Sequence, residues 1–298
     1  MNNKDTITEE SLIEDIKKAG VPEGCLLHLK VSLKSIGKVE GGPQTVLNAI
    51  LKVVGDSGTI VIDSFVTSYP LPLSEKNASN ISTNESPSFA GAVANAMVKH
   101  PKSVRSKHPI QRFTAIGPLA HELMDNHTPE SGGYDVLERM AKMNALNLSI
   151  GRKVIGVGTT HVAIEKMKYK KKPSNMAVNY LADDGSVKCF VADWKWTCSA
   201  GFPKFLPLYE KGGALKWVKI GNAEAALTNM NKTLDIEQKR LEEDPRFFFC
   251  DDPTCKSCRL EWEHSTGNYF SVKFYSAIKL LTNPDALKYW IKNKTNKH

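Results

Sequence analysis

Two apolar runs near the N-terminus, separated by a glycine-containing loop and one helix, constrain the fold most strongly. The runs are CLLHLKV at 25–31 and TIVIDSF at 59–65, and both have the length of buried strands. Between them, the apolar spacing at 46–54 predicts a helix that opens after Gly42-Pro43. Strands joined through a helix are typical of an α/β fold with a crossover connection. We therefore expect a mixed central sheet flanked by helices.

A change of pattern near residue 172 predicts a second, smaller part of the chain. After it, KCFVADWKWTC at 188–198 alternates like an antiparallel strand, and 223–243 has a long helical pattern. We expect an α/β part at residues 1–172 and a mixed α+β part at 173–298.

The composition indicates a chain that works in the cytoplasm. No apolar run approaches the roughly 18 residues of a membrane span, so no membrane partner is expected. The N-terminal segment is polar and acidic, unlike a signal peptide. Six cysteines in 298 residues, three of them clustered, do not form the pattern of a secreted disulfide framework. The sequence is also compatible with a homo-oligomer.

The net charge of +8 favours anionic partners, such as nucleotides, coenzyme A or nucleic acid, over polycations. The alternative is that the charge only keeps the protein in solution. A basic run lies at 166–172, and it is either a solvated face or an anchor for phosphate. No nucleic-acid-binding motif accompanies this run, so no nucleic-acid partner is expected. The lysines are Lys166, Lys168, Lys170, Lys171 and Lys172.

The loop between the first strand and helix has the features of an anion-binding site. Free N–H groups and the dipole of a helix N-terminus favour phosphate. The alternative is an ordinary connection between a strand and a helix, because the loop matches no standard phosphate-binding motif. The candidate residues are Lys30, Ser32, Ser35, Gly37, Gly41 and Gly42.

His161 and Glu165 form a candidate acid–base pair. If the segment after Gly158 is helical, their i, i+4 spacing places them on one face. A carboxylate beside an imidazole sets its tautomer and raises its basicity, as a general base requires. Thr160 could cap this helix or supply a hydroxyl group to a site. The alternative is a surface His–Glu pair.

The spacing Cys250-x4-Cys255-x2-Cys258 is compatible with a tetrahedral zinc site in a module at 250–264. The fourth ligand could be His264, or Cys189 or Cys198 from the preceding segment. Such a zinc would be structural, because all of its positions would be filled. Reduced surface thiols and a redox role are the alternatives.

Three stretches of the sequence follow one another in the order in which a known protein family has them. They are SLKSIGKVEGG at 32–42, RSKHP at 105–109 and VIGVGTTHVAIE at 154–165. Together they resemble the antibiotic N-acetyltransferase family, which comprises the aminoglycoside N-acetyltransferases and their relatives. The resemblance covers roughly residues 10–170.

The resemblance implies an α/β enzyme that binds an acyl-coenzyme A, carrying an acetyl or a hydroxyacyl group, and acylates an amine directly. It implies that the loop from Lys30 to Gly42 cradles the coenzyme, and that Arg105, Ser106 and His108 line the same cleft. The chain departs from the family pattern in two places. Lys30 stands where the family usually has histidine, and His161-x3-Glu165 replaces the usual His-x-x-Glu.

For the acceptor, the charge of the chain leads us to expect an anionic amine. The main expectation is a dTDP-linked amino-dideoxy sugar, as in the anthrose-type N-acyltransferases that some relatives resemble, for surface glycan biosynthesis. An aminoglycoside, with antibiotic resistance as the role, is the alternative, and another amine stays open. A zinc-containing nucleic-acid-binding protein is the remote alternative.

The expected mechanism uses no covalent acyl-enzyme. His161, oriented by Glu165, takes a proton from the acceptor amine, which then attacks the thioester. Backbone N–H groups of the glycine loop, or the hydroxyl of Thr160 or Ser32, stabilise the oxyanion. Asp63, at the end of the second strand, orients the amine.

Overall fold

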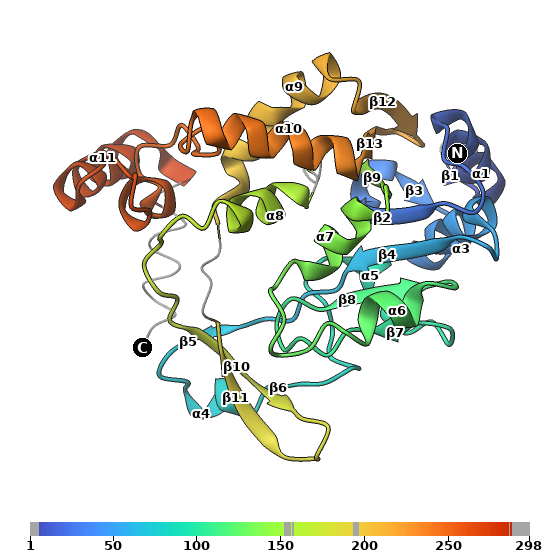
Figure 1. The fold of residues 1–298 in the computed structure, drawn as a ribbon, viewed down its shortest axis with the longest axis horizontal. Helices are drawn as coiled ribbons and strands as arrows, with labels where there is room; N and C mark the ends of the chain where they lie inside the picture. Colours follow the sequence, from blue (N-terminus) through green and yellow to red (C-terminus); the bar gives the residue numbers. More distant parts are fainter. Residues whose placement is uncertain (1–5, 152–155, 157, 193–196, 286, 288–298) are drawn as a thin grey trace.

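One seven-stranded sheet organises the computed structural model, which describes residues 6–151, 156, 158–192, 197–285 and 287 (Figure 1). The strand order is β12-β13-β9-β2-β4-β8-β7. β2 pairs in parallel with β4 and β9, and the other pairings are antiparallel. The strands are β2 (Leu26–Val31), β4 (Thr59–Asp63), β7 (Val104–Arg105), β8 (Phe113–Ile116), β9 (Leu146–Ile150), β12 (Leu215–Ile220) and β13 (Ala223–Asn229). The predicted mixed sheet is confirmed.

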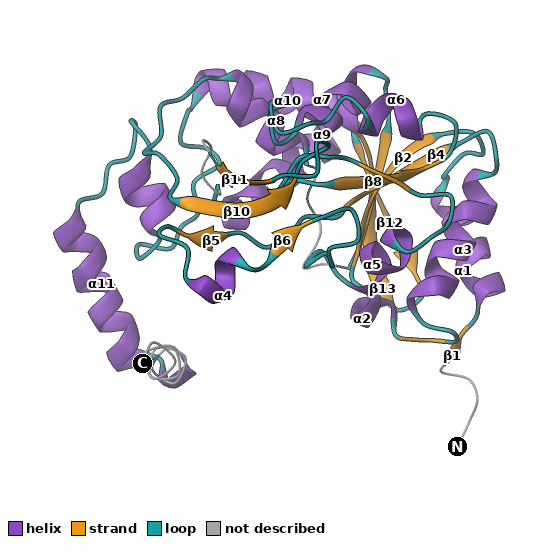
Figure 2. Ribbon diagram, turned by 90° about the horizontal axis from the view of Figure 1, so that it is seen from below, coloured by secondary structure: helices purple, strands orange, loops and turns teal. Residues whose placement is uncertain are grey.

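Helices cover both faces of this sheet, as Figure 2 shows in a view turned by 90°. One apolar layer packs β4 residues Ile60 and Ile62 against α1, α3 and α5, and the other packs Val61 against α6, α7, α8 and α10. This alternation follows from the two-residue period of a strand. The helices are α1 (Glu9–Ala19), α3 (Pro43–Val54), α5 (Ala92–Val98), α6 (Ala120–Met124), α7 (Asp135–Lys142), α8 (Thr159–Lys166) and α10 (Met230–Glu243).

The ends of α3 follow from its sequence. Pro43 occupies the first turn, where its missing N–H group costs nothing, and Gly42 and Gly55 flank the helix with φ of +69°. Both positive φ angles suit glycine, so the predicted helix begins and ends where expected. The run KVIGVG at 153–158, just before α8, has the apolar character of a strand, but residues 152–155 and 157 lie outside the described residues.

A second, four-stranded sheet joins segments far apart in the chain. β10 pairs antiparallel with β11 and β5 and parallel with β6, so the long loop at 68–88 is held against a later hairpin. The predicted strand at 188–198 corresponds in part to β11, and residues 193–196 lie outside the described residues. The strands are β5 (Tyr69–Pro70), β6 (Ile81–Ser82), β10 (Met176–Leu181) and β11 (Val187–Val191).

The remaining elements are short, except for one helix near the C-terminus. They are β1 (Thr6–Ile7), α2 (Leu33–Ile36), β3 (Lys38–Val39), α4 (Glu75–Ala78), η3 (Ser199–Phe205), α9 (Leu206–Lys211), η4 (Ser257–Glu261) and α11 (Tyr269–Thr282). The boundary at residue 172 stays a prediction, although β12 and β13 from beyond it complete the large sheet. Across the described residues, no helix combines the length and the apolar character that a bilayer crossing needs.

Three residues of the RSKHP stretch, Arg105, Ser106 and His108, are buried and hold loops together. Arg105 is 9% exposed and donates hydrogen bonds to the carbonyl oxygens of Ser64 (2.6 Å), Asn84 (2.7 Å) and Ser86 (2.6 Å). Ser106 accepts from the N–H of Phe113 at 2.9 Å. These bonds attach the long loop to the edge of the large sheet.

His108 completes this cluster. Its Nδ1 accepts from the N–H groups of Ile110 (3.2 Å) and Gln111 (2.9 Å), and its ring stacks on His127 with centroids 5.0 Å apart. Burial lowers the pKa of His108 to about 3 and that of His127 to about 4, so both rings are neutral at pH 7. A neutral, buried imidazole can act as a fixed hydrogen-bond acceptor.

We expect Arg105→Ala to lower the free energy of unfolding by about 2 to 4 kcal/mol, because it leaves the buried carbonyl group of Ser64 and two part-buried carbonyl groups of the 84–86 loop without their donor. The matched control is Lys107→Ala, which removes an exposed ion pair with Asp183 and should cost less than about 1 kcal/mol. Urea denaturation followed by circular dichroism measures both. Equal losses in the two variants would contradict a structural role for Arg105.

Candidate active site

The carboxyl ends of the parallel strands bring a buried charged cluster together. His28 and Lys30 lie two residues apart on β2, Asp63 ends β4, and Asn147 lies on β9. His28 Nε2 lies 3.0 Å from Asp63 Oδ1, and Lys30 Nζ lies 3.8 Å from Asp63 Oδ2. In open α/β sheets, ligands bind at this end of the strands. The cluster therefore lies where the fold favours a site.

His28 is held from both sides. Its Nδ1 lies 2.9 Å from Asn147 Oδ1, an oxygen that can only accept a hydrogen bond. The amide nitrogen of Asn147 donates to Thr228 Oγ1 and Ser149 Oγ, each at 3.2 Å, which agrees with this orientation of the amide. His28 thus donates from Nδ1 to Asn147 and presents Nε2 to Asp63.

Asp63 carries a negative charge at this site although it is only 7% exposed. Burial opposes ionisation, but the charges of His28 and Lys30 outweigh it, and the pKa of Asp63 stays below its usual value. The ionised carboxylate of Asp63 and the ammonium group of Lys30 create a strong local electric field at this site. The pKa of any ionisable side chain close to Asp63 therefore depends on these charges.

His161 is the group that faces this field from a helix. It lies in the first turn of α8, half-buried, with its ring stacked on Tyr134 (centroids 4.3 Å apart, 1° between planes). The ring of Phe202 packs against the imidazole in a T-shaped arrangement, with ring centroids 5.0 Å apart. Burial and the charge of Lys30 lower the pKa of His161 to about 3, and Asp63 partly opposes the shift. His161 is therefore neutral at pH 7, and one of its ring nitrogens is a hydrogen-bond acceptor.

His161 and Glu165 line one cavity of about 210 Å³, so the structure brings the predicted pair to a common space. Three residues of the lysine run line it too, Lys168, Lys171 and Lys172. Lys171 Nζ lies 4.6 Å from the ring centroid of Trp262. Lys166, by contrast, pairs with Glu138 at 2.8 Å on the surface.

Thr160 points into the core between α8 and α10. Its hydroxyl donates to the carboxyl group of Glu237, which also accepts from the hydroxyl of Tyr209. Burial raises the pKa of Glu237 to about 8. Thr159 bonds similarly to Thr233 at 3.0 Å. These contacts engage the Thr160 hydroxyl in packing, and its predicted catalytic role stays a prediction.

The glycine loop divides into packed and open positions. Ser35 Oγ donates to Ser32 Oγ at 2.8 Å, and a Cβ on Gly37 (φ +116°) would lie 2.7 Å from the Asn222 side chain. Gly42 has open space beside it, because a Cβ there would meet no atom within 4 Å. Gly41 has a φ of +70° and is exposed. The start of α3 is thus accessible to an anion, whereas Gly37 is needed for close packing.

The residues predicted to line the coenzyme cleft from the RSKHP stretch have protein partners instead. Arg105, Ser106 and His108 bond within the loop network described above. Their contact with a coenzyme stays a prediction, and the structure gives them a supporting role.

The predicted metal ligands need one correction. Cys250, Cys255 and Cys258 lie together, and the fourth member of the cluster is Cys198, with all four sulfur atoms within 4.8 Å of one another. His264 is not in this cluster, because its ring stacks on Phe249 with centroids 5.2 Å apart. Cys189 is exposed on β11. The sequence alternative Cys198 therefore replaces His264 as the fourth candidate.

The predictions from sequence do not include several of the residues that form this site. A polar residue inside an apolar strand was an available signal for His28 and for Asn147 in LNLSI. Nothing in the local sequence marks Tyr134 or Phe202, since their contacts with His161 come from distant segments.

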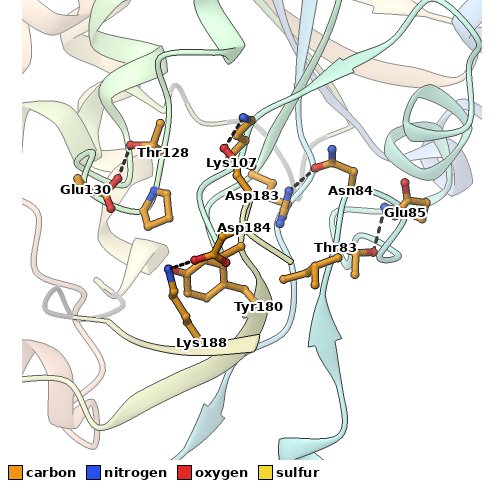
Figure 3. Close-up of a pocket in the computed structure, with 14 residues that line it drawn as sticks. Thr83, Asn84, Glu85, Lys107, Thr128, Glu130, Tyr180, Asp183, Asp184 and Lys188 are labelled. Atoms are coloured by element: carbon orange, nitrogen blue, oxygen red, sulfur yellow. Dashed lines mark hydrogen bonds and ion pairs between the residues drawn. The ribbon is translucent and has the colours of Figure 1, made fainter. Parts of the chain in front are cut away.

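Figure 3 shows a different pocket, of about 500 Å³, between the 83–85 loop, the 128–130 loop and the β10–β11 hairpin. Two of its four acidic groups form ion pairs with lysines: Asp183 pairs with Lys107 at 2.7 Å and Asp184 with Lys188 at 3.0 Å. This pocket has no lining residue in common with the His161 cavity. Because it contains no histidine, the His161 cavity is the better candidate for acid–base chemistry.

Comparison with known proteins identifies the family. A family model described as aminoglycoside 3-N-acetyltransferase matches residues 27–242. The aminoglycoside N(3)-acetyltransferase VIII of Streptomyces fradiae is 33% identical over 134 residues, covering 41% of this chain and 47% of the relative. The chain thus aligns with about half the length of the first curated relatives it matches.

Solved structures show the same fold. An aminoglycoside acetyltransferase, crystallised as a histidine-to-alanine mutant in complex with gentamicin, has a TM-score of 0.68 at 22% identity, covering 83% of this chain and 92% of that one. A binary complex of another acetyltransferase with CoASH has a TM-score of 0.68 at 17% identity, covering 80% and 97%.

These findings contradict the expectation of a nucleotide-linked amino sugar as acceptor, since the matching family and relatives are named for aminoglycosides. Net charge misled because it sums over the whole surface, whereas recognition depends on the few charges inside a site. The family model spans well over half of the 298 residues. The chain therefore belongs to the aminoglycoside 3-N-acetyltransferase family.

Proposed function

We propose that this protein is an N-acetyltransferase that transfers the acetyl group of acetyl-coenzyme A to an amino group of an aminoglycoside. The observation that carries the proposal is the neutral His161 in its cavity beside the buried Asp63 cluster. Membership of the family supports the reaction class. Solved relatives described with gentamicin and with CoASH support the two substrates.

The reaction needs a base because an aminoglycoside amine is an ammonium ion at neutral pH. In the proposed mechanism His161 accepts this proton and Glu165 orients the imidazole. The amine nitrogen then bonds to the thioester carbon, and the carbon–sulfur bond breaks as the tetrahedral intermediate collapses. His161 returns its proton to the leaving thiolate, so that free coenzyme A is released and the imidazole is neutral again. The nitrogen that has formed the new bond loses its remaining excess proton to water, so that the product is a neutral amide and one proton is released overall.

The tetrahedral intermediate carries an oxyanion that needs donors. We assign this role to backbone N–H groups of the glycine loop together with Ser32. The start of α3, open beside Gly42, is the proposed contact for the phosphates of the coenzyme.

A polycationic acceptor can bind to a chain of net charge +8 if its ammonium groups meet the local carboxylates. Glu165 lines the His161 cavity and the charge of Asp63 reaches His161, and we propose that these two carboxylates attract the acceptor. Lys171 and Lys172, on the same cavity, are proposed to face the anionic coenzyme. This arrangement separates the two substrates by the sign of their charge.

The direct test is release of free thiol from acetyl-coenzyme A in the presence of gentamicin or sisomicin, with mass spectrometry of the product. We expect stoichiometric thiol release and one added acetyl group. A dTDP-linked amino sugar serves as the negative control. Binding of acetyl-coenzyme A without transfer to any aminoglycoside would reject the proposal.

We expect His161→Gln to lower kcat by about 10²- to 10⁴-fold, since it removes the general base. Binding of acetyl-coenzyme A, measured by calorimetry, should stay nearly unchanged. The control is His121→Gln, which alters an exposed histidine paired with Asp125 on α6. Near-normal turnover in His161→Gln would remove this residue from the mechanism.

The protonation of His161 gives a separate prediction. In the wild type its imidazole should not titrate between pH 5 and 8, because its pKa lies at about 3. Lys30→Met removes a nearby positive charge that disfavours the imidazolium, so it should raise the pKa of His161. NMR of ¹³C-labelled histidines, assigned with His161→Gln, measures this, and exposed Lys34→Met is the control. An unchanged pKa in Lys30→Met would be inconsistent with the proposed field.

A further inference from the structure

Four cysteines that the proposed reaction does not use gather at one point of the fold. Their sulfur atoms all lie within 4.8 Å of one another. Around a tetrahedral zinc ion with Zn–S bonds of about 2.3 Å, sulfur atoms lie about 3.8 Å apart. The observed spread is compatible with closure around one ion after small side-chain adjustments. We propose that Cys198, Cys250, Cys255 and Cys258 bind one structural Zn²⁺ ion.

The local backbone supports thiolate ligands. The N–H of Cys250 points to Cys258 Sγ at 3.4 Å, and such a bond orients the sulfur toward the other cysteines in the way that outer hydrogen bonds orient metal ligands. Arg259 donates to the carbonyl oxygens of Cys250 (2.6 Å) and Asp252 (3.3 Å), which fixes the turn between the ligands. It also places a positive charge beside a site of four thiolates and one Zn²⁺, whose net charge would be −2.

The ligand set indicates the metal and its role. Four soft thiolates select zinc over hard cations such as Mg²⁺ and Ca²⁺. A closed set of four protein ligands leaves no position for substrate, as in structural rather than catalytic zinc sites. Cys250 and Cys258 are buried, and Cys198 and Cys255 are half-buried, so the ion would be mostly enclosed.

The position of Cys198 shows what the ion would stabilise. Cys198 immediately precedes η3, and the ring of Phe202 on η3 packs against His161. Gly201 contacts the backbone of Phe248 and Phe249 so closely that no side chain fits there. The other ligands come from residues 250–258, a segment whose only regular structure is the short η4. A zinc ion would join these two segments and hold Phe202 against the ring of His161.

The test is metal analysis of the full chain, expressed without a polyhistidine tag and purified without added metal. We expect about one zinc per chain in the wild type by inductively coupled plasma mass spectrometry. Cys258→Ser should lose at least about 10-fold in zinc occupancy. The matched control is Cys189→Ser, an exposed cysteine outside the cluster, which should retain the metal.

Two further measurements keep the proposal testable if Cys258→Ser does not fold. Replacement of the wild-type metal by Co²⁺ should produce the thiolate-to-cobalt charge-transfer absorption of a tetrahedral sulfur site. Removal of the metal from the wild type by a chelator should lower its melting temperature, and addition of Zn²⁺ should restore it. Neither readout depends on enzymatic activity, so failure of the proposed function would not affect the result.

Three outcomes overturn the proposal. The first is a folded wild type without metal and with all four thiols free to react. The second is a mass, measured without reductant, that shows disulfides among the four cysteines. The third is full zinc occupancy in Cys258→Ser, which would place the ion elsewhere.

Discussion

The site depends on one buried carboxylate. Asp63 closes β4, and its charge is tolerated there because His28 and Lys30 on the neighbouring parallel strand compensate it. A slip of β2 by one residue would turn both basic side chains to the opposite face and leave the carboxylate unpaired, which is strongly destabilising in a protein interior. Two of these charges also reach His161: burial is the main cause that lowers the pKa of its imidazole, the charge of Lys30 adds to this effect, and the charge of Asp63 opposes it.

Packing around α8 fixes the position of the His161 ring in this field. Tyr134 from the start of α7 and Phe202 from η3 enclose the His161 ring, and the contact of Thr160 with Glu237 attaches the helix to α10. Each of these partners comes from a different segment of the chain. The candidate base is therefore positioned by segments that a two-domain division at residue 172 would separate.

Global and local charge lead to different conclusions for this protein. The excess of lysine and arginine favours an anionic acceptor, whereas the family and its relatives are named for aminoglycosides. The two observations are reconciled if the positive residues serve mainly the coenzyme and solubility, and a few carboxylates receive the acceptor. An enzyme that binds one anionic and one cationic substrate needs charges of both signs in one cavity, and the His161 cavity contains Glu165 beside three lysines.

Local patterns in the sequence predict the features that depend on neighbouring residues. The mixed α/β class, the glycine and proline boundaries of α3, the shared face of His161 and Glu165, and the three-cysteine spacing follow from local periodicity and turn chemistry. Which distant residues meet depends on the folded chain. Strand pairing and core packing join His28 to Asp63 and Asn147, place Cys198 rather than His264 beside the other three cysteines, and bury Arg105 beside the carbonyl group of Ser64. Because these partners lie between 35 and 119 positions apart in the sequence, no local pattern encodes their contact.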